Sequence, residues 1–250
     1  MSMISRIEQI SMNAWPSLYT VMYDGWVLRI SDGITRRANS ISPLFGSERE
    51  TEEKIRFCEE FYSSKGLPVI YKMTSRVCPA DLDRILEVSG YQRDAETSVR
   101  TVSTGDFDEI DSDIISIGDT FSGEWLDRFL DFNGYRSSSR KGFENIMKQI
   151  VFQCGFLDLT IDGQYAGCGL GVIEGNHVGL FDIVVAPGYR RRGYGQTIVE
   201  SLISWGRMNG ADTAYLQVMT DNPAAGNLYS RIGFTEVYKY WYRIGREEIR

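Results

Sequence analysis

The chain contains few of the residues on which hydrolytic and metal-dependent sites usually depend. Its 250 residues include one histidine, His177, and four scattered cysteines without a C-x-x-C pair. A Ser-His-Asp or Cys-His mechanism would have to use that histidine, and a zinc site would lack its usual ligands. Both classes are therefore disfavoured, and no metal is expected. His177 is predicted to begin a strand, and the cysteines are predicted to be buried, reduced thiols.

Long apolar runs are missing as well. No stretch approaches the roughly 18 consecutive apolar residues of a membrane-spanning helix, and residues 1–13 lack the apolar segment of a signal peptide. We therefore expect a cytoplasmic protein with no membrane partner. The formal net charge of -7 disfavours a broad nucleic-acid-binding surface. A hydrophobic content of 42% is sufficient for one large domain or two small ones.

A basic turn with two glycines separates a predicted strand from a predicted helix. The apolar segment 178–185 stops at Pro187, because proline cannot continue a sheet ladder. After residue 195, apolar residues recur on one face with a 3.6-residue period, which predicts a helix to about residue 208. The run Arg190-Arg191-Arg192-Gly193-Tyr194-Gly195 lies between the two.

This turn has the properties of an anion site. The first amides of a helix have no intrahelical acceptor and lie at the positive end of the helix dipole. Gly193 and Gly195 would leave these amides accessible, and the arginines would add positive charge. The pattern therefore predicts a site for one small anionic group. A solvated basic turn and a nucleic-acid contact are the alternatives, and the latter predicts strongly salt-dependent duplex binding.

The order of predicted elements in the first half of the chain recurs in the second. Each copy has a strand ending at proline, a helix, a strand, a short helix ending at glycine, and a last strand. Pro43 and Pro187 are 144 residues apart, and Gly90 and Gly233 are 143 apart. The repeat predicts two related α/β halves in tandem. Because no basic residue follows Pro43 directly, the anion site is predicted in the second copy alone.

The segment between the copies has its own pattern. The acidic stretch 106–113 is predicted to be a linker or a helix start. Helices are predicted at about 112–120, 124–132 and 142–152, before a hairpin of strands 155–161 and 164–173. Gly167, Gly169 and Gly171 alternate within the second strand, so they predict close backbone packing rather than a nucleotide loop.

Together these features resemble the GNAT superfamily of acetyltransferases. The resemblance is carried by the strand ending at Pro187, the R-x-x-G-x-G turn at 190–195, the strand 214–218, and then Asn222, Ala225, Leu228-Tyr229 and Gly233-Phe234. It covers about residues 155–244. The segment from Asp24-Gly25-Trp26 to Arg37-Ala38-Asn39-Ser40 also resembles the N-terminal part of bacterial two-module members.

The resemblance implies an α/β fold of two tandem GNAT-like modules, each a mixed, centrally splayed β-sheet flanked by helices. Residues 1–105 would form a degenerate N-terminal module, and residues 106–250 the catalytic domain. The implied function is transfer of an acetyl group from acetyl-CoA to a primary amine by direct attack. A non-catalytic acyl-CoA-binding regulatory or interaction module is the alternative.

The resemblance also implies roles for particular residues. Backbone groups in the strand would hold the pantetheine arm, amides of the turn would hold the pyrophosphate, and an asparagine would contact the pantetheine. These residues are Val184 and Val185, then Arg190, Arg191, Arg192, Gly193, Tyr194 and Gly195, and finally Asn222. The Tyr229 hydroxyl would protonate the departing thiolate, with packing alone as the alternative reading.

Amine acylation needs a neutral amine, a polarised carbonyl and a proton for the sulfur, but no metal. Asp182 is the leading candidate for the base. It alternates with Phe181 and Ile183, so its carboxylate is predicted on the face opposite to theirs. A satisfied polar residue at a strand bend, or at the rim of the acceptor site, is the alternative reading, and Glu124 or Glu174 could substitute as base.

The acceptor is expected to be a small-molecule or peptide amine. The run 238–243, Trp125 and Phe129 are candidates for the walls of its pocket, with packing as the alternative reading. The sequence does not distinguish a polyamine, an amino acid, an antibiotic or a protein N-terminus. The oligomeric state is also open, a homodimer included.

Overall fold

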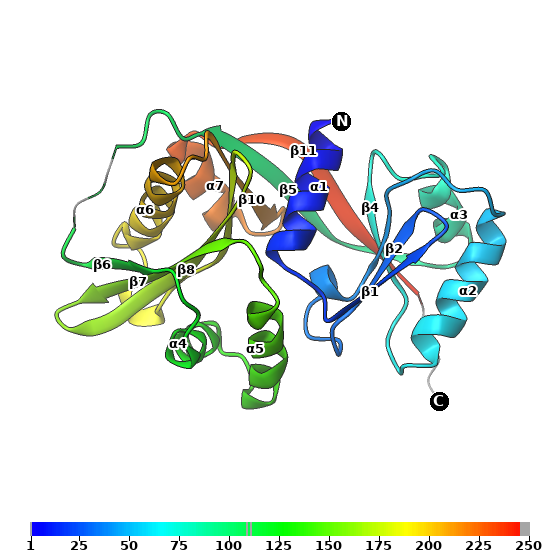
Figure 1. The fold of residues 1–250 in the computed structure, drawn as a ribbon, viewed down its shortest axis with the longest axis horizontal. Coiled ribbons are helices and arrows are strands. Elements are labelled where there is room, and N and C mark those ends of the chain that lie inside the picture. Colours follow the sequence, from blue (N-terminus) through cyan, green and yellow to red (C-terminus); the bar gives the residue numbers. More distant parts are fainter. Residues whose placement is uncertain (1, 109, 111, 246–250) are drawn as a thin grey trace. The chain divides into compact units, whose positions relative to one another are not determined.

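A computed structural model of the chain describes residues 2–108, 110 and 112–245, and it shows mixed helices and strands, which confirms the predicted α/β class (Figure 1). The helices are α1 (Met3–Ala14), α2 (Thr51–Ser63), α3 (Leu82–Val88), α4 (Gly123–Asn133), α5 (Arg140–Lys148), α6 (Tyr194–Met208) and α7 (Pro223–Ile232). The strands are β1 (Tyr19–Tyr23), β2 (Trp26–Ile30), β3 (Ile41–Pro43), β4 (Ile70–Thr74), β5 (Gln92–Ser103), β6 (Ile115–Gly118), β7 (Gln153–Ile161), β8 (Gln164–Glu174), β9 (His177–Val185), β10 (Thr213–Met219) and β11 (Thr235–Ile244).

Two compact units divide the chain, and neither is a continuous segment. Of the described residues, unit 1 takes those in Met1–Ser98, Met219–Asp221 and Tyr238–Arg250, and unit 2 takes those in Val99–Val218 and Asn222–Val237. Strands β5 and β11 are each shared between the units. A single cut at 105/106 therefore does not describe the compact units.

Unit 1 contains the strand order β1-β2-β3-β4, followed by the C-terminal half of β11. The β4–β11 pair is antiparallel, from Tyr240 opposite Thr74 to Ile244 opposite Ile70. Apolar residues of α2 and α3 pack against these strands. The Tyr62 hydroxyl fixes α2 to β2, because it accepts from the Arg29 amide at 3.0 Å and donates to the Arg29 carbonyl at 2.9 Å.

Unit 2 contains the order β5-β10-β9-β8-β7-β6, with helices on both sides of the sheet (Figure 1). Helix α6 approaches β8 closely because that strand has glycine at alternate positions. A Cβ at Gly169 would lie 2.9 Å from Ile198 Cγ2, and one at Gly171 would lie 2.9 Å from Trp205 Cζ3. The prediction that these glycines serve close packing is confirmed.

The prediction of a helix over 112–120 is wrong. Residues 115–118 form strand β6, which pairs antiparallel with β7 from Ile115 opposite Leu159 to Gly118 opposite Phe156. The burial of β6 alternates with a period of two, and Ile115 and Ile117 pack against the core. Glu109 and Asp111 of the predicted acidic linker lie outside the described residues.

The copies predicted from the repeat have the same order of elements. The order β3-α2-β4-α3-β5 in the first half corresponds to β9-α6-β10-α7-β11 in the second. Helix α1 and the β1–β2 hairpin precede the repeat. Three of the cysteines are buried, Cys78 is partly buried, and all four are free thiols, as predicted.

Candidate functional site

Strands β9 and β10 separate part of the way along their length. They pair in parallel from Thr213 opposite His177 to Leu216 opposite Leu180. The register ends there, although β9 continues to Val185 and β10 to Met219. The sheet of unit 2 is therefore splayed where the resemblance places the donor, and His177 begins the strand as predicted.

A bulge distorts β9 along its other edge, where it pairs with β8. Leu170 of β8 lies opposite Phe181, but Cys168 lies opposite Val184, so β9 contains an extra residue. Asp182 has a left-handed backbone with φ of 52°. The extra residue reverses the alternation of side chains beyond it.

Because of this bulge, Phe181 and Ile183 do not share a face of β9, and the predicted orientation of Asp182 from alternation is wrong. Phe181 packs edge-on against Tyr215, with ring centroids 6.0 Å apart, whereas Ile183 packs with the α6 core. The two neighbours therefore lie on opposite faces of the strand. The Asp182 carboxylate is close enough to Cys168 to help raise the pKa of that thiol, although burial is the larger cause. Its Oδ2 is buried.

The turn before α6 presents amides that precede the helical hydrogen-bond ladder. The amides of Gln196 and Thr197 are the first to donate to a helical carbonyl, that of Gly193, at 2.9 and 3.3 Å. Arg191 and Gly193 both have left-handed backbones, with φ of 64° and 89°. Such alternation turns successive amides toward one side and forms an anion-binding concavity. No acidic residue occupies the first turn of α6.

The arginines of the turn have different contacts. Arg190 Nε donates to the Val185 carbonyl at 2.9 Å, so one expected pantetheine acceptor already has a partner. The Arg192 guanidinium lies 5.7 Å from the centre of the Tyr189 ring. All three arginines are exposed, and they add positive charge beside the amides.

Helix α7 supplies the predicted asparagine and tyrosine. The Asn222 Oδ1 accepts from the Ala225 amide at 3.1 Å, so this residue is the N-cap of the helix. Tyr229 is half-buried and packs edge-on against Phe234 at 5.9 Å. Burial raises the pKa of Tyr229 to about 12, which keeps its hydroxyl protonated at neutral pH.

Close packing holds α7 beside the turn. A Cβ at Gly195 would lie 3.3 Å from Leu228 Cδ2, so the absence of a side chain lets the two helices approach. Leu228 directly precedes Tyr229. The structure therefore gives Gly195 a packing role in addition to the expected access to its amide.

The predicted acceptor walls are mostly packed. Trp125 and Phe129 of α4 are 1% and 4% exposed, and the Trp125 Nε1 donates to the Leu157 carbonyl at 3.0 Å. Glu174 lies opposite His177, five residues along β9 from Asp182. This separation is about 17 Å at the usual rise of a strand, so Glu174 is a poor substitute for the base. The run 238–243 belongs to unit 1, where Tyr238, Tyr240, Tyr242 and Arg243 are buried.

Sequence reasoning missed an ion pair on the same face as Cys168. Arg128 of α4 donates to both oxygens of Asp158 on β7, at 2.9 and 2.5 Å, and its guanidinium lies 3.9 Å from the Tyr165 ring centre. Asp158 pairs with Cys168 across the β7–β8 ladder. Arg128 is 30 residues from Asp158 in the sequence, and no local pattern links the two.

The residues of unit 2 fit a long ligand with an anionic group. The turn offers amides and arginines to a pyrophosphate, and the separated strands offer backbone groups to an extended arm. Among residues 2–108, 110 and 112–245, no group of three or more His, Cys, Asp and Glu side chains could hold a metal ion. No helix in the same residues is long and apolar enough to cross a membrane.

Comparison with known proteins identifies the family. The family described as "Probable histone acetyltransferase Rv0428c C-terminal" matches residues 1–243. The uncharacterized N-acetyltransferase YobR of Bacillus subtilis is 31% identical over 249 residues, which cover 97% of this chain and 99% of YobR. The chain belongs to the GNAT family of N-acetyltransferases. This GNAT protein is thus an acyl-CoA-dependent acetyltransferase.

Solved GNAT structures have the same fold. A GCN5-related N-acetyltransferase from Kribbella flavida covers 99% of this chain with 98% of its own, at a TM-score of 0.73 and 14% identity. A tandem GNAT protein from the clavulanic acid biosynthesis pathway covers 97% of this chain with 89% of its own, at a TM-score of 0.63 and 11% identity. The likeness extends over both halves of this GNAT protein.

Proposed function

We propose that this chain transfers an acetyl group from acetyl-CoA to a primary amine by direct attack of the amine on the thioester carbonyl. One observation carries the proposal. In unit 2, the end of the β9–β10 pairing, the amide turn of α6 and the half-buried Tyr229 occur together on consecutive elements. The acceptor is a small-molecule or peptide amine.

The donor is held by the turn and by the edge of β9. The amides of residues 191–195 and the arginine side chains bind the pyrophosphate, whereas the Arg190 amide already donates to the Pro187 carbonyl at 3.4 Å. The backbone of Val184 and Val185 aligns the pantetheine arm, apart from the Val185 carbonyl that Arg190 Nε occupies. Asn222 contacts the same arm through the part of its amide that does not cap α7. When bound, acetyl-CoA supplies the acetyl thioester.

Tyr229 is the general acid. As the amine nitrogen bonds to the carbonyl carbon and the C–S bond breaks, the nitrogen loses one proton and the sulfur gains one. Full transfer from a hydroxyl with a pKa of about 12 to a thiolate of ordinary pKa, about 8.5, would be uphill by about 5 kcal/mol. Tyr229 therefore first donates a hydrogen bond to the sulfur. The hydroxyl proton moves to the sulfur only as the proton released by the amine nitrogen reprotonates the Tyr229 oxygen.

Asp182 is the provisional base. Its position in a bulge, next to the end of the β9–β10 pairing, supports a carboxylate that is held in place while a water relays a proton from the ammonium. Asparagine tolerates a left-handed backbone, so Asp182→Asn should keep the bulge. We expect this variant to lower kcat/KM for the amine, with a smaller deficit at high pH, where more of the amine is already neutral.

The variant Tyr229→Phe tests the proposal. We expect kcat to fall about 100-fold, the lower end of the usual range for an acid catalyst, with an unchanged acetyl-CoA Kd. Tyr135→Phe, at an exposed tyrosine of the same unit, is the matched control and should behave like the wild type. An unchanged kcat for Tyr229→Phe under conditions where chemistry limits the rate would remove this residue from the mechanism.

A further inference from the structure

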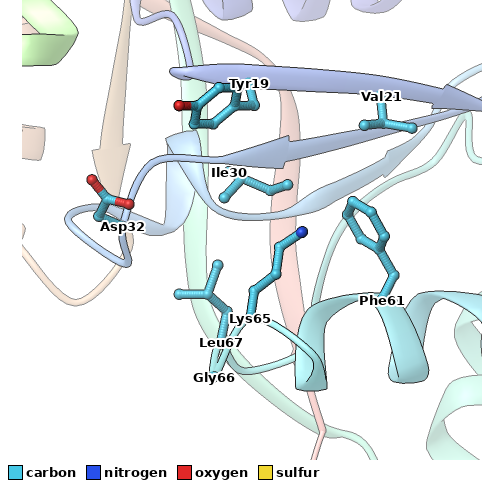
Figure 2. A pocket seen from close by; sticks show the side chains of 8 residues that line it. All are labelled: Tyr19, Val21, Ile30, Asp32, Phe61, Lys65, Gly66 and Leu67. Atoms are coloured by element: carbon cyan, nitrogen blue, oxygen red, sulfur yellow. The ribbon is translucent and has the colours of Figure 1, made fainter.

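Unit 1 contains a hollow of about 770 Å³ that acetyl transfer does not explain (Figure 2). It lies between the β1–β2 hairpin and the C-terminal end of α2. Val21 and Ile30 of the hairpin, Phe61 of α2, and Leu67 form its apolar walls. The volume is in the range of sites for drug-sized ligands.

The hollow is not a remnant of a second cofactor site. A cofactor turn precedes α6 in unit 2, and the corresponding position in unit 1 precedes α2, after Pro43. The hollow lies at the other end of α2, where Lys65 and Gly66 follow the helix. A helix of 13 residues separates the two positions by about 20 Å.

Both signs of charge border the hollow. Lys65 extends between Ile30 and Phe61 in Figure 2, and its Nζ lies 4.7 Å from the centre of the Phe61 ring. Asp32 is a lining residue on the turn after β2, and the Tyr19 hydroxyl points to that side in the same view. Neither Asp32 nor Lys65 forms an ion pair with another residue in the described part of the chain.

The turn that carries Asp32 is fixed by hydrogen bonds. Asp32 and Gly33 both have left-handed backbones, with φ of 52° and 74°. The Asn39 Oδ1 accepts from the Ser31 amide at 2.7 Å and from the Gly33 amide at 3.0 Å. Because the backbone of the turn is already fixed, binding a ligand at Asp32 has to order only its side chain.

We propose that this hollow binds a small amphiphilic zwitterion, such as a short apolar peptide with free termini. The ligand ammonium faces Asp32 and the Tyr19 hydroxyl, its carboxylate faces Lys65, and its apolar side chains lie against Val21 and Leu67. Asp32 and Lys65 are both exposed, so a ligand with both charges gains two attractive contacts where a ligand with one charge gains one. The proposal does not depend on acetyl transfer.

The dipeptide L-phenylalanyl-L-leucine is a suitable probe for the full chain, with binding measured by isothermal titration calorimetry. We expect saturable binding with a Kd below about 1 mM, which is a modest affinity for a ligand held by charged and apolar contacts. The N-acetylated dipeptide and the dipeptide amide should each bind at least about tenfold more weakly, which corresponds to about 1.4 kcal/mol.

Two variants assign that binding to the hollow. Asp32→Asn keeps a residue that tolerates the left-handed backbone, and Lys65→Met keeps the length of the side chain. Asp32→Asn should weaken binding of the free dipeptide about tenfold and leave binding of the N-acetylated form unchanged. Lys65→Met should also weaken binding of the free dipeptide about tenfold, and it should leave binding of the dipeptide amide unchanged. Asp131→Asn and Lys141→Met, at exposed residues of unit 2, are matched controls.

Three results would overturn the proposal. The first is no binding of the dipeptide up to several millimolar. The second is equal binding of the free and capped forms. The third is binding to Asp32→Asn and Lys65→Met that matches the controls, which would place the dipeptide elsewhere, for instance as an acceptor in unit 2.

Discussion

A buried ion pair in unit 1 provides a strong test of the packing described above. Lys72 of β4 donates to both oxygens of Glu8 on α1, at 2.9 and 2.7 Å, and the two side chains are 6% and 1% exposed. The Tyr238 hydroxyl of β11 donates to the same carboxylate at 2.6 Å. The Lys72 ammonium also lies 4.1 Å from the centre of the Tyr240 ring.

The variants Glu8→Gln, Lys72→Met and their combination separate the cost of an unpaired charge from the value of the pair. Each single change leaves one buried charge without its counter-ion, so we expect a loss of about 3–5 kcal/mol in the free energy of unfolding. The double variant removes both charges of the pair, and Arg29, which is buried near Glu8, stays in all three variants. The loss in the double variant should therefore be smaller than the sum of the single losses, with a coupling energy of about 2–3 kcal/mol.

Urea unfolding followed by hydrogen-exchange mass spectrometry of α1 and β4 would report these losses within unit 1. Glu53→Gln, on α2 of the same unit, is the matched control, because the Arg49 and Glu53 side chains form an ion pair but are 51% and 47% exposed. We expect no measurable loss there, since solvent screens the pair. Single variants of Glu8 and Lys72 that behave like this control, or losses that simply add, would refute the reasoning.

Three further outcomes follow from the site and its packing. Gly169→Ala would place a Cβ 2.9 Å from Ile198 Cγ2 of α6, and it should lower the free energy of unfolding by about 1–3 kcal/mol in a thermal unfolding assay. Gly118→Ala, where nothing lies within 4 Å, should be neutral in that assay. Gly193→Ala, at φ of 89°, should raise the acetyl-CoA Kd about tenfold, and Gly210→Ala, at φ of 93° beyond the other end of α6, should not change it. Because burial raises the pKa of Tyr229 to about 12, nearly all of its hydroxyl stays protonated up to about pH 10, and kcat should show no alkaline fall attributable to this residue between pH 7 and about pH 10.

The parts of the site that depend on neighbouring residues were predictable from sequence. A proline after an apolar run, a basic Gly-x-Gly turn and a 3.6-residue period indicate a strand, a turn and a helix, because each reflects a local conformational preference. The same holds for the glycines of β8, whose alternation predicted close packing, although only the structure shows that α6 is the partner. Tyr229 was found through its place in a family motif, and its burial became visible only in the fold.

The bulge in β9 shows where local reasoning fails. Predicting side-chain faces from alternation assumes an uninterrupted ladder. No sequence pattern around Asp182 indicates the extra residue that β9 has opposite β8. The helix predicted over 112–120 is wrong for a related reason. Ile115 and Ile117 fit either a short helix or a strand until their partner strand is known. The Arg128–Asp158 pair likewise depends on tertiary packing of α4 against β7.

The composition of unit 1 changes how the N-terminal half should be understood. A repeat predicts which elements occur, but it does not say which strand completes which group of strands. Residues 238–245 belong to unit 1, where Tyr238 bonds Glu8 and Arg243 donates to both oxygens of Asp83 at 2.9 Å. We therefore propose that residues 1–105 support the catalytic domain of residues 106–250, although they lack a cofactor turn of their own. Deleting residues 1–103 would leave Tyr238 and Arg243 without these partners and would remove the part of β5 that belongs to unit 2. A soluble, fully active remainder would contradict this dependence, because the buried tyrosines of β11 would then need no cover from α1 and β4.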